Sequence, residues 1–196
     1  MKNLVVFASG SGSNFQSIID AISEGILDAE IVGFISNNKS AYSAKRALEH
    51  NIPVLIISPS DFDDEKNYST AILNQLKNWN AEVLILAGYL KKIPSEIITA
   101  FKDNILNIHP SLLPKYGGKG FYGINVHKAV IENEEIESGC TVHIVTEEYD
   151  QGSILGQSKV KVLPTYTPSD LAEKVLEKEH ELFPLTIQQH LKTQKK

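Results

Sequence analysis

"NLVVFASGSGSNFQSIID", residues 3–20, joins an apolar run to an amphipathic segment through a loop of glycine and serine. Residues 3–8 have the composition of a buried strand, and residues 13–25 have the periodicity of a helix with Ser13 or Asn14 at its cap. A buried strand followed by a helix is the unit from which parallel sheets with helices on both faces are built. This stretch therefore predicts an α/β fold.

The same alternation continues along the first half of the chain. Apolar strands are predicted at 30–36, 53–58, 82–88 and 104–109, and helices at 43–51, 61–79 and 94–101. The pattern then changes to two alternating apolar and polar segments joined by a turn, as in an antiparallel pair, at 139–147 and 153–164, before a last helix at 168–191. We expect one domain over 1–196, Rossmann-like and parallel in its first half, that continues into a mixed sheet with a C-terminal antiparallel pair and a final helix.

Composition and charge narrow the class of protein. Of the 196 residues, 42% are hydrophobic and 22% are charged, which is ordinary globular usage. The formal net charge of −5 disfavours binding to a nucleic-acid backbone. The single cysteine, Cys140, offers neither a disulfide framework nor a cysteine-based zinc site. No signal peptide is recognisable and no apolar run approaches the ~18 residues of a membrane span, so we expect a cytoplasmic protein.

The loop after the first strand is predicted to bind an anion. Gly12, Ser13 and Asn14 open the helix, whose positive end attracts a phosphate. The dinucleotide fingerprint is incomplete, because position 15 is Phe15 and the second strand ends in Ser36 without a following acid. A Gly-Lys-Ser/Thr P-loop is also missing. A single phosphate monoester is the remaining ligand, and a turn that only caps the helix is the structural alternative.

The strand at 104–109 ends in polar side chains. Asn107 and His109 are two residues apart, so both point to the same face of a strand, and Pro110 stops the strand directly after them. An amide donor and an imidazole at the C-terminal end of a buried strand are placed for catalysis, and a hydrogen-bonded structural pair is the alternative. The other histidines are weaker candidates, and mid-strand His143 is expected to be structural. No metal site is predicted, because no second ligand lies at suitable spacing from His109.

Asp150 is the predicted charge partner of His109. It lies in a turn beside Gly152, which permits a close approach of the backbone. A neighbouring carboxylate raises the pKa of an imidazole and keeps it protonated. An ordinary turn aspartate is the alternative.

Three motifs then carry a family resemblance: "SGSGSN", "NIHPSLLPKY" and "HIVTEEYDQGSIL". In this order and at these separations they resemble the phosphoribosylglycinamide formyltransferase family, and the resemblance covers essentially the whole chain. It implies a transferase of purine biosynthesis and one-carbon metabolism that moves the formyl group of 10-formyltetrahydrofolate to the amine of 5′-phosphoribosylglycinamide. Both partners are small molecules, the folate is the only cosubstrate implied, and a monomer and a homodimer are both compatible.

The resemblance also implies residue roles. It makes 1–103 the phosphate-binding half and 104–196 the catalytic and folate-binding half, with Asn107, His109 and Asp150 as the catalytic residues. The ribonucleotide would be held by Gly12, Ser13, Asn14 and Glu179. The folate would contact Lys66, Leu90, Lys91, Lys92, Ile93, Asn107, Thr146, Glu147, Glu148, Tyr149 and Asp150.

Some positions depart from the family's pattern. Leu90-Lys91-Lys92 stands where relatives often have Met-Arg, so a planar bidentate contact is lost, and Lys66 follows Glu65 where some relatives carry Arg. The loop 117–125 is longer than in some relatives. A formyltetrahydrofolate deformylase or a methionyl-tRNA formyltransferase is the nearest alternative, although each normally carries an extra domain. A non-catalytic nucleotide-binding module is the alternative from another class.

Overall fold

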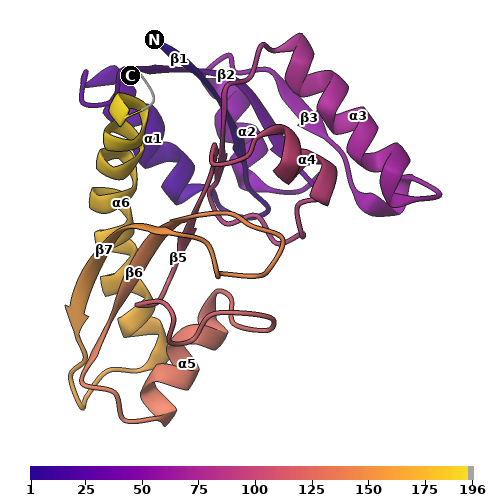
Figure 1. Cartoon of the computed structure of the whole chain (residues 1–196). Coiled ribbons are helices and arrows are strands. Elements are labelled where there is room, and N and C mark those ends of the chain that lie inside the picture. Colours follow the sequence, from indigo (N-terminus) through magenta and orange to yellow (C-terminus); the bar gives the residue numbers. More distant parts are fainter. Residues whose placement is uncertain (194–196) are drawn as a thin grey trace. The chain divides into compact units, whose positions relative to one another are not determined.

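The computed structural model describes residues 1–193 and is shown in Figure 1. The chain divides into two compact units, Met1–Asn107 and a second that begins at Ile108. Within the described residues, no helix is both long enough and apolar enough to span a membrane. The expectation of one domain stays a prediction.

The first unit is a parallel sheet with helices between its strands. Its strands are hydrogen-bonded in the order β3-β2-β1-β4-β5. The elements follow in the sequence β1 (Lys2–Phe7), α1 (Ser13–Ser23), β2 (Ala29–Ser36), α2 (Tyr42–Glu49), β3 (Val54–Ile56), the 3-10 turn η1 (Pro59–Asp61), α3 (Glu65–Asn78), β4 (Val83–Leu86), α4 (Ser95–Ala100) and β5 (Ile105–His109).

Burial on both faces explains why these strands are apolar throughout. Leu4 to Phe7 in β1 are completely buried, and so are Leu84 and Ile85 in β4. Phe15 of α1 stacks on Phe34 of β2 with 4.9 Å between the ring centroids, which fixes the helix against the sheet. The C-terminal ends of the parallel strands therefore form a common edge that carries the loops.

The second unit holds an antiparallel pair and two helices. β6 (Glu137–Ile144) pairs with β7 (Ile154–Lys161), and both strands pack against α6 (Pro168–Thr193), while α5 (Ile124–Glu132) also contacts α6 (Figure 1). β6 is buried from Ser138 to Ile144, whereas β7 alternates between partly buried and exposed residues. The α6 N-terminus is closed by a capping box, in which the Asp170 amide donates to Thr167 Oγ1 and the Thr167 amide donates to Asp170 Oδ2.

The predicted fold class is confirmed, with the seven strands in the order β3-β2-β1-β4-β5-β6-β7 and a final helix. Three details differ from the sequence-based expectations. The long helix begins at Glu65 rather than 61, because η1 forms a separate turn and the Asp64 side chain caps the helix by accepting from the Asn67 amide at 2.7 Å. β3 is only three residues long. Helix α5 begins at Ile124, inside the stretch 117–125 that was expected to be a loop, and had no predicted counterpart.

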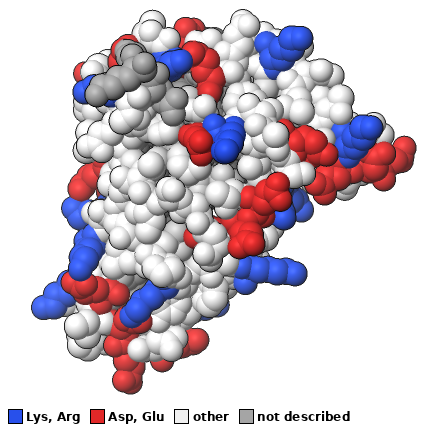
Figure 2. Space-filling view, viewed as in Figure 1, with Lys and Arg blue, Asp and Glu red and all other residues white. Residues whose placement is uncertain are grey.

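Figure 2 shows acidic and basic side chains interspersed over the face in view, without a broad basic surface. Together with the net charge of −5, this distribution gives no electrostatic footprint for a nucleic-acid backbone on that face.

Candidate active site

The loop between β1 and α1 has the backbone geometry of an anion site. Gly12 is the N-cap of α1 in the left-handed conformation, with φ of 74°, and no side chain caps the helix at this position. A Cβ added to Gly12 would lie 2.6 Å from the Cβ of Ser43, so the loop requires glycine for both its conformation and its space. No acidic residue lies in the first turn to neutralise the positive helix end.

Helix α2 supports this loop with a charged side chain that the sequence analysis missed. Arg46 Nε donates to the Ser11 carbonyl at 3.0 Å, and its Nη1 donates to Gln16 Oε1 at 2.9 Å. The Ser43 amide donates to the Gly10 carbonyl at 3.1 Å. Arg46 is more than 30 positions from the loop in the chain, so no local motif links the two.

The strand ends of the first unit are joined by Ser9. Its hydroxyl donates to Asn37 Oδ1 at 2.5 Å and accepts from the Leu90 amide at 2.9 Å. This contact holds the β4–α4 loop, in which the Leu90 side chain is 60% exposed. An exposed large apolar side chain at a strand end is available to a ligand.

The other residues predicted to contact a folate differ in accessibility. Lys91 and Lys92 are exposed, as is Lys66 in the first turn of α3. Ile93 is only 4% exposed, so its side chain belongs to the core beneath the β4–α4 loop and offers little surface to a ligand. In the second unit, the turn after β6 exposes Thr146, Glu147, Glu148 and Tyr149.

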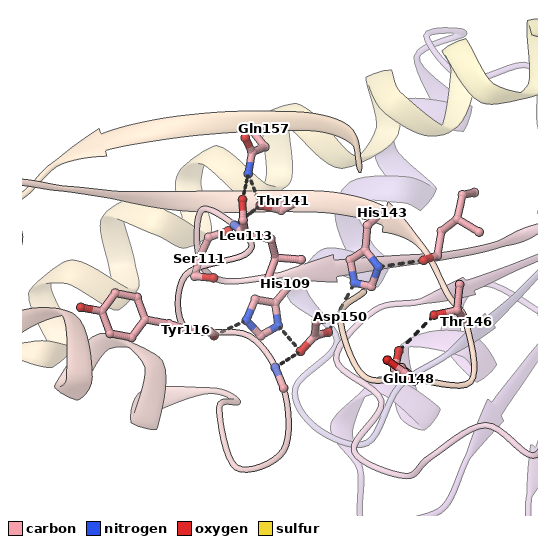
Figure 3. A network of polar contacts seen from close by, with 12 residues as sticks. His109, Ser111, Leu113, Tyr116, Thr141, His143, Thr146, Glu148, Asp150 and Gln157 are labelled. Atoms are coloured by element: carbon pink, nitrogen blue, oxygen red, sulfur yellow. Dashed lines mark hydrogen bonds and ion pairs between the residues drawn. The ribbon is translucent and has the colours of Figure 1, made fainter. Parts of the chain in front are cut away.

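His109 ends β5 with both ring nitrogens directed at oxygen atoms (Figure 3). Its Nε2 lies 2.8 Å from the Tyr116 carbonyl oxygen, and its Nδ1 lies 3.7 Å from Asp150 Oδ2. The side chain of His109 is almost completely buried. Asn107 precedes it by two residues in the same strand, so strand geometry directs both side chains to one face.

Asp150 is held by a loop and by a second histidine. Its Oδ2 accepts a hydrogen bond from the Gly118 amide at 2.8 Å, and its Oδ1 lies 3.4 Å from Nε2 of His143 (Figure 3). The turn that carries Asp150 lies directly against β6. Gly152 in this turn is so close that an added Cβ would overlap the carbonyl of Ile144. The fold thus brings the predicted His109 and Asp150 side chains together.

His143 was expected to be a structural residue in the middle of a strand, but its side chain lies beside Asp150. Its Nδ1 lies 2.9 Å from the Ile144 carbonyl oxygen and its Nε2 faces the Asp150 carboxylate. The resulting His109–Asp150–His143 cluster was not predicted, because His143 and Asp150 meet only through the turn after β6.

The pKa of His109 differs from the one expected from the sequence. We expected Asp150 to raise the pKa of His109 overall. Burial lowers the pKa of His109 by more than Asp150 and the Tyr116 carbonyl raise it, so the pKa lies below 6.5. Burial also raises the pKa of the Asp150 carboxyl, but the hydrogen bond from His143, the charge of His109 and the Gly118 amide outweigh it, so Asp150 is ionised at neutral pH.

His127 is a buried neutral imidazole near this cluster. Its side chain is 4% exposed, and Nδ1 is a buried atom without a hydrogen-bond partner among the described residues. Burial, and then the charge of His109, lowers the pKa of His127 from 6.5 to about 4. The unfolded chain therefore binds a proton at a higher pH than the folded chain. His127 thus contributes stability that is present above pH 6.5 and is lost as the pH falls toward 4.

Replacing His127 by leucine should flatten this pH dependence. Between pH 7 and pH 5 the free energy of unfolding should fall by about 1–2 kcal/mol less in His127→Leu than in the unaltered protein. Urea unfolding at the two pH values measures the difference. Asn125→Leu, at an exposed position of the same helix, is the control. Equal pH dependence in His127→Leu and the unaltered protein would contradict this account.

Glu179 lies in α6 and is only 7% exposed, which is unusual for a carboxylate and is compatible with a role in binding. Among the described residues, no group of three or more histidine, cysteine or acidic side chains could hold a metal ion. The geometry thus consists of an anion loop in the first unit and, in the second, two buried histidines that face the carboxylate of Asp150.

Comparison with known proteins identifies the class. The family described as "Formyl transferase" matches residues 2–187. The chain therefore belongs to the formyl transferase family. Its relatives in that family include proteins named phosphoribosylglycinamide formyltransferase.

The chloroplastic phosphoribosylglycinamide formyltransferase of Arabidopsis thaliana is 45% identical over 183 residues, which are 93% of this chain and 63% of that protein. The chain spans 58% of the matching protein of Vigna unguiculata. The Haemophilus influenzae enzyme is 37% identical over 95% of this chain and 86% of its own length. The crystal structure of phosphoribosylglycinamide formyltransferase from Bacillus halodurans has a TM-score of 0.91 at 32% identity, covering 97% of this chain and 95% of that one.

Proposed function

We propose that this protein transfers the formyl group of 10-formyltetrahydrofolate to the amine of 5′-phosphoribosylglycinamide, giving formylglycinamide ribonucleotide and tetrahydrofolate. The observation that carries the proposal is the contact between His109, buried at the end of β5, and the largely shielded carboxylate of Asp150, in a chain of the formyl transferase family. A shielded acid–base pair at a strand end suits the transfer of an acyl-type group. The reaction would belong to purine biosynthesis in the cytoplasm.

The chemistry requires one proton to change place. The neutral amine attacks the formyl carbon, and the carbonyl oxygen becomes an oxyanion. Asn107 and protonated His109 would donate hydrogen bonds to this oxygen, and each such donor is worth about 3–4 kcal/mol of transition-state stabilisation. Collapse of this centre breaks the bond to N10 of the folate, and the proton that the amine loses passes to N10. The developing oxyanion adds negative charge beside Asp150, which favours the imidazolium of His109 at that moment.

A covalent intermediate has no support in Cys140. Burial, and then the nearby Glu179 carboxylate, raises the pKa of this thiol to about 12. The thiolate fraction at neutral pH is therefore negligible. Direct attack by the amine is the route that the residues support.

The remaining predicted contacts fit the two substrates. The phosphate would bind the amides of Gly12, Ser13 and Asn14, and Glu179 would hold the ammonium or amide groups of the glycinamide. Leu90 offers an apolar contact to the pterin ring. The ammonium groups of Lys66, Lys91 and Lys92 offer charge to the carboxylates of the folate. The turn 146–150 would supply the other folate contacts, and the partners are these small molecules, without nucleic acid or membrane.

The direct test is an assay of tetrahydrofolate formation from 10-formyltetrahydrofolate, with and without 5′-phosphoribosylglycinamide. We expect turnover only when the ribonucleotide is present. Turnover in its absence would instead indicate a deformylase. Binding of the ribonucleotide without any turnover would indicate a non-catalytic binding module.

The anion loop gives a second test. Gly12→Ala places a Cβ against Ser43 and strains a left-handed position, so it should move the amides that bind phosphate. We expect KM for the ribonucleotide to rise by at least about tenfold, with a smaller effect on kcat. Ser40→Ala, at an exposed site before α2, is the control. Unchanged binding of the ribonucleotide to Gly12→Ala would remove the loop from the proposed site.

A further inference from the structure

We propose that Tyr116 and Glu135 are positioning residues that fix the tautomer of His109 and leave Nδ1 as its working nitrogen. This inference rests on the proposed function for its catalytic consequence. Its structural part concerns residues of the second unit alone, so it can be measured independently of turnover.

The tautomer follows from the hydrogen bond between His109 and Tyr116. The Tyr116 carbonyl can only accept, so the proton of neutral His109 lies on Nε2, 2.8 Å away. Nδ1 then carries a lone pair when the ring is neutral and an N–H when it is protonated. Nδ1 is also the atom that faces Asp150, at a distance of 3.7 Å that is longer than a hydrogen bond. Proton gain and loss at His109 are thereby confined to the nitrogen beside Asp150.

The direction of the Tyr116 carbonyl depends on an unusual backbone conformation. Tyr116 has φ of 54°, in the left-handed region that residues with a side chain rarely adopt. Such a conformation costs free energy and persists only where surrounding contacts hold it. Gly117 follows directly, and a Cβ there would come within 3.2 Å of the Asp150 Cβ, so the same backbone segment also borders the carboxylate.

The Tyr116 side chain supplies that hold. Its hydroxyl donates to Glu135 Oε1 at 3.1 Å, and Lys115 Nζ donates to both carboxylate oxygens of Glu135 at 2.8 and 3.0 Å. The ring of Phe121 packs edge-on against Tyr116, with 5.9 Å between centroids. Hydrogen bonds from Lys115 and Tyr116 lower the pKa of Glu135, and burial followed by the hydrogen bond to Glu135 raises the pKa of Tyr116. The pair therefore remains a phenol and a carboxylate over the working pH range.

Packing alone does not fix the Tyr116 ring. A cavity of about 320 Å³ borders it, lined by apolar side chains of Leu112, Val130 and Ile136 and by Glu135. Since the ring has free space on this side, the hydroxyl contact with Glu135 is what selects its position. Loss of that contact would release the backbone carbonyl from His109.

Kinetics with two variants test the proposal. Tyr116→Phe and Glu135→Ala should each lower kcat for formyl transfer by about five- to tenfold, with KM for both substrates within about twofold. The double variant should show no further loss, because both changes break one hydrogen bond. The matched controls are Tyr122→Phe, at an exposed tyrosine, and Glu137→Ala, which breaks the surface pair with Lys159.

Nitrogen-15 NMR identifies the tautomer of His109 directly, and this measurement does not require the protein to be active. At pH 8 the spectrum of the unaltered protein should show His109 protonated at Nε2 only, with the signals assigned from their loss in His109→Gln. In Tyr116→Phe the two tautomers should exchange. If the unaltered protein is inactive but the tautomer changes as expected, the proposed function fails and the positioning role stands. If kcat and the tautomer both match the unaltered protein in Tyr116→Phe and Glu135→Ala, the positioning role is wrong.

Discussion

The His109→Ala protein is expected to form product with a kcat about 100- to 1,000-fold below that of the unaltered protein, the usual cost of one lost oxyanion donor. The change removes the imidazole that the mechanism uses at Nδ1, and it leaves the anion loop of the first unit untouched. KM for 5′-phosphoribosylglycinamide should therefore stay within about twofold. Single-turnover kinetics and ribonucleotide binding by calorimetry separate the two effects.

The matched control for this variant is His50→Ala, at an exposed histidine of the α2 C-terminus. It should keep the kcat of the unaltered protein. Circular dichroism at pH 8 checks that His109→Ala is folded, since removal of a buried ring leaves a cavity. A folded His109→Ala protein with near-normal kcat would show that His109 has no part in the chemistry.

The Asp150→Asn protein is expected to lose about 100-fold in kcat and to change its pH profile. The amide keeps the size of the carboxylate and one oxygen for the Gly118 amide, but it removes the negative charge beside His109 and His143. Burial has the largest effect on the pKa of His109 and lowers it; Asp150 and the Tyr116 carbonyl raise the pKa, and His143 lowers it. Charged His109 is the reactive form, so kcat should fall as the pH rises through the pKa of His109.

The substitution removes one of the two contacts that raise this pKa. The descending limb of the profile of log kcat against pH should therefore move to lower pH in Asp150→Asn. Asp63→Asn, at an exposed aspartate before α3, provides the control and should keep the profile of the unaltered protein. A profile in Asp150→Asn that coincides with that of the unaltered protein would show that Asp150 does not set the charge of His109.

Periodicity was sufficient to predict most of the fold. The uniformly apolar segments became β1, β2, β4 and β5 because strands covered on both faces have no polar side, and the alternating segments became the antiparallel pair β6 and β7. Helix α5 was not predicted. It follows glycine-rich sequence, and its N-cap, Gly123, makes no side-chain hydrogen bond. Without a cap signal, its start cannot be read from the residues.

Some features of the candidate site depend on neighbouring residues and others on long-range contacts. The sequence by itself determined the glycine loop before α1 and the pairing of Asn107 with His109, because loop conformation and strand alternation depend on neighbouring residues. Only the tertiary structure decided that Asp150 lies between two histidines and that Tyr116 orients one of them. Arg46 reaches its loop in the same manner. These contacts join residues that are separated along the chain, so neighbouring residues do not reveal them. The pKa of His109 likewise depends on how deeply the fold buries its ring.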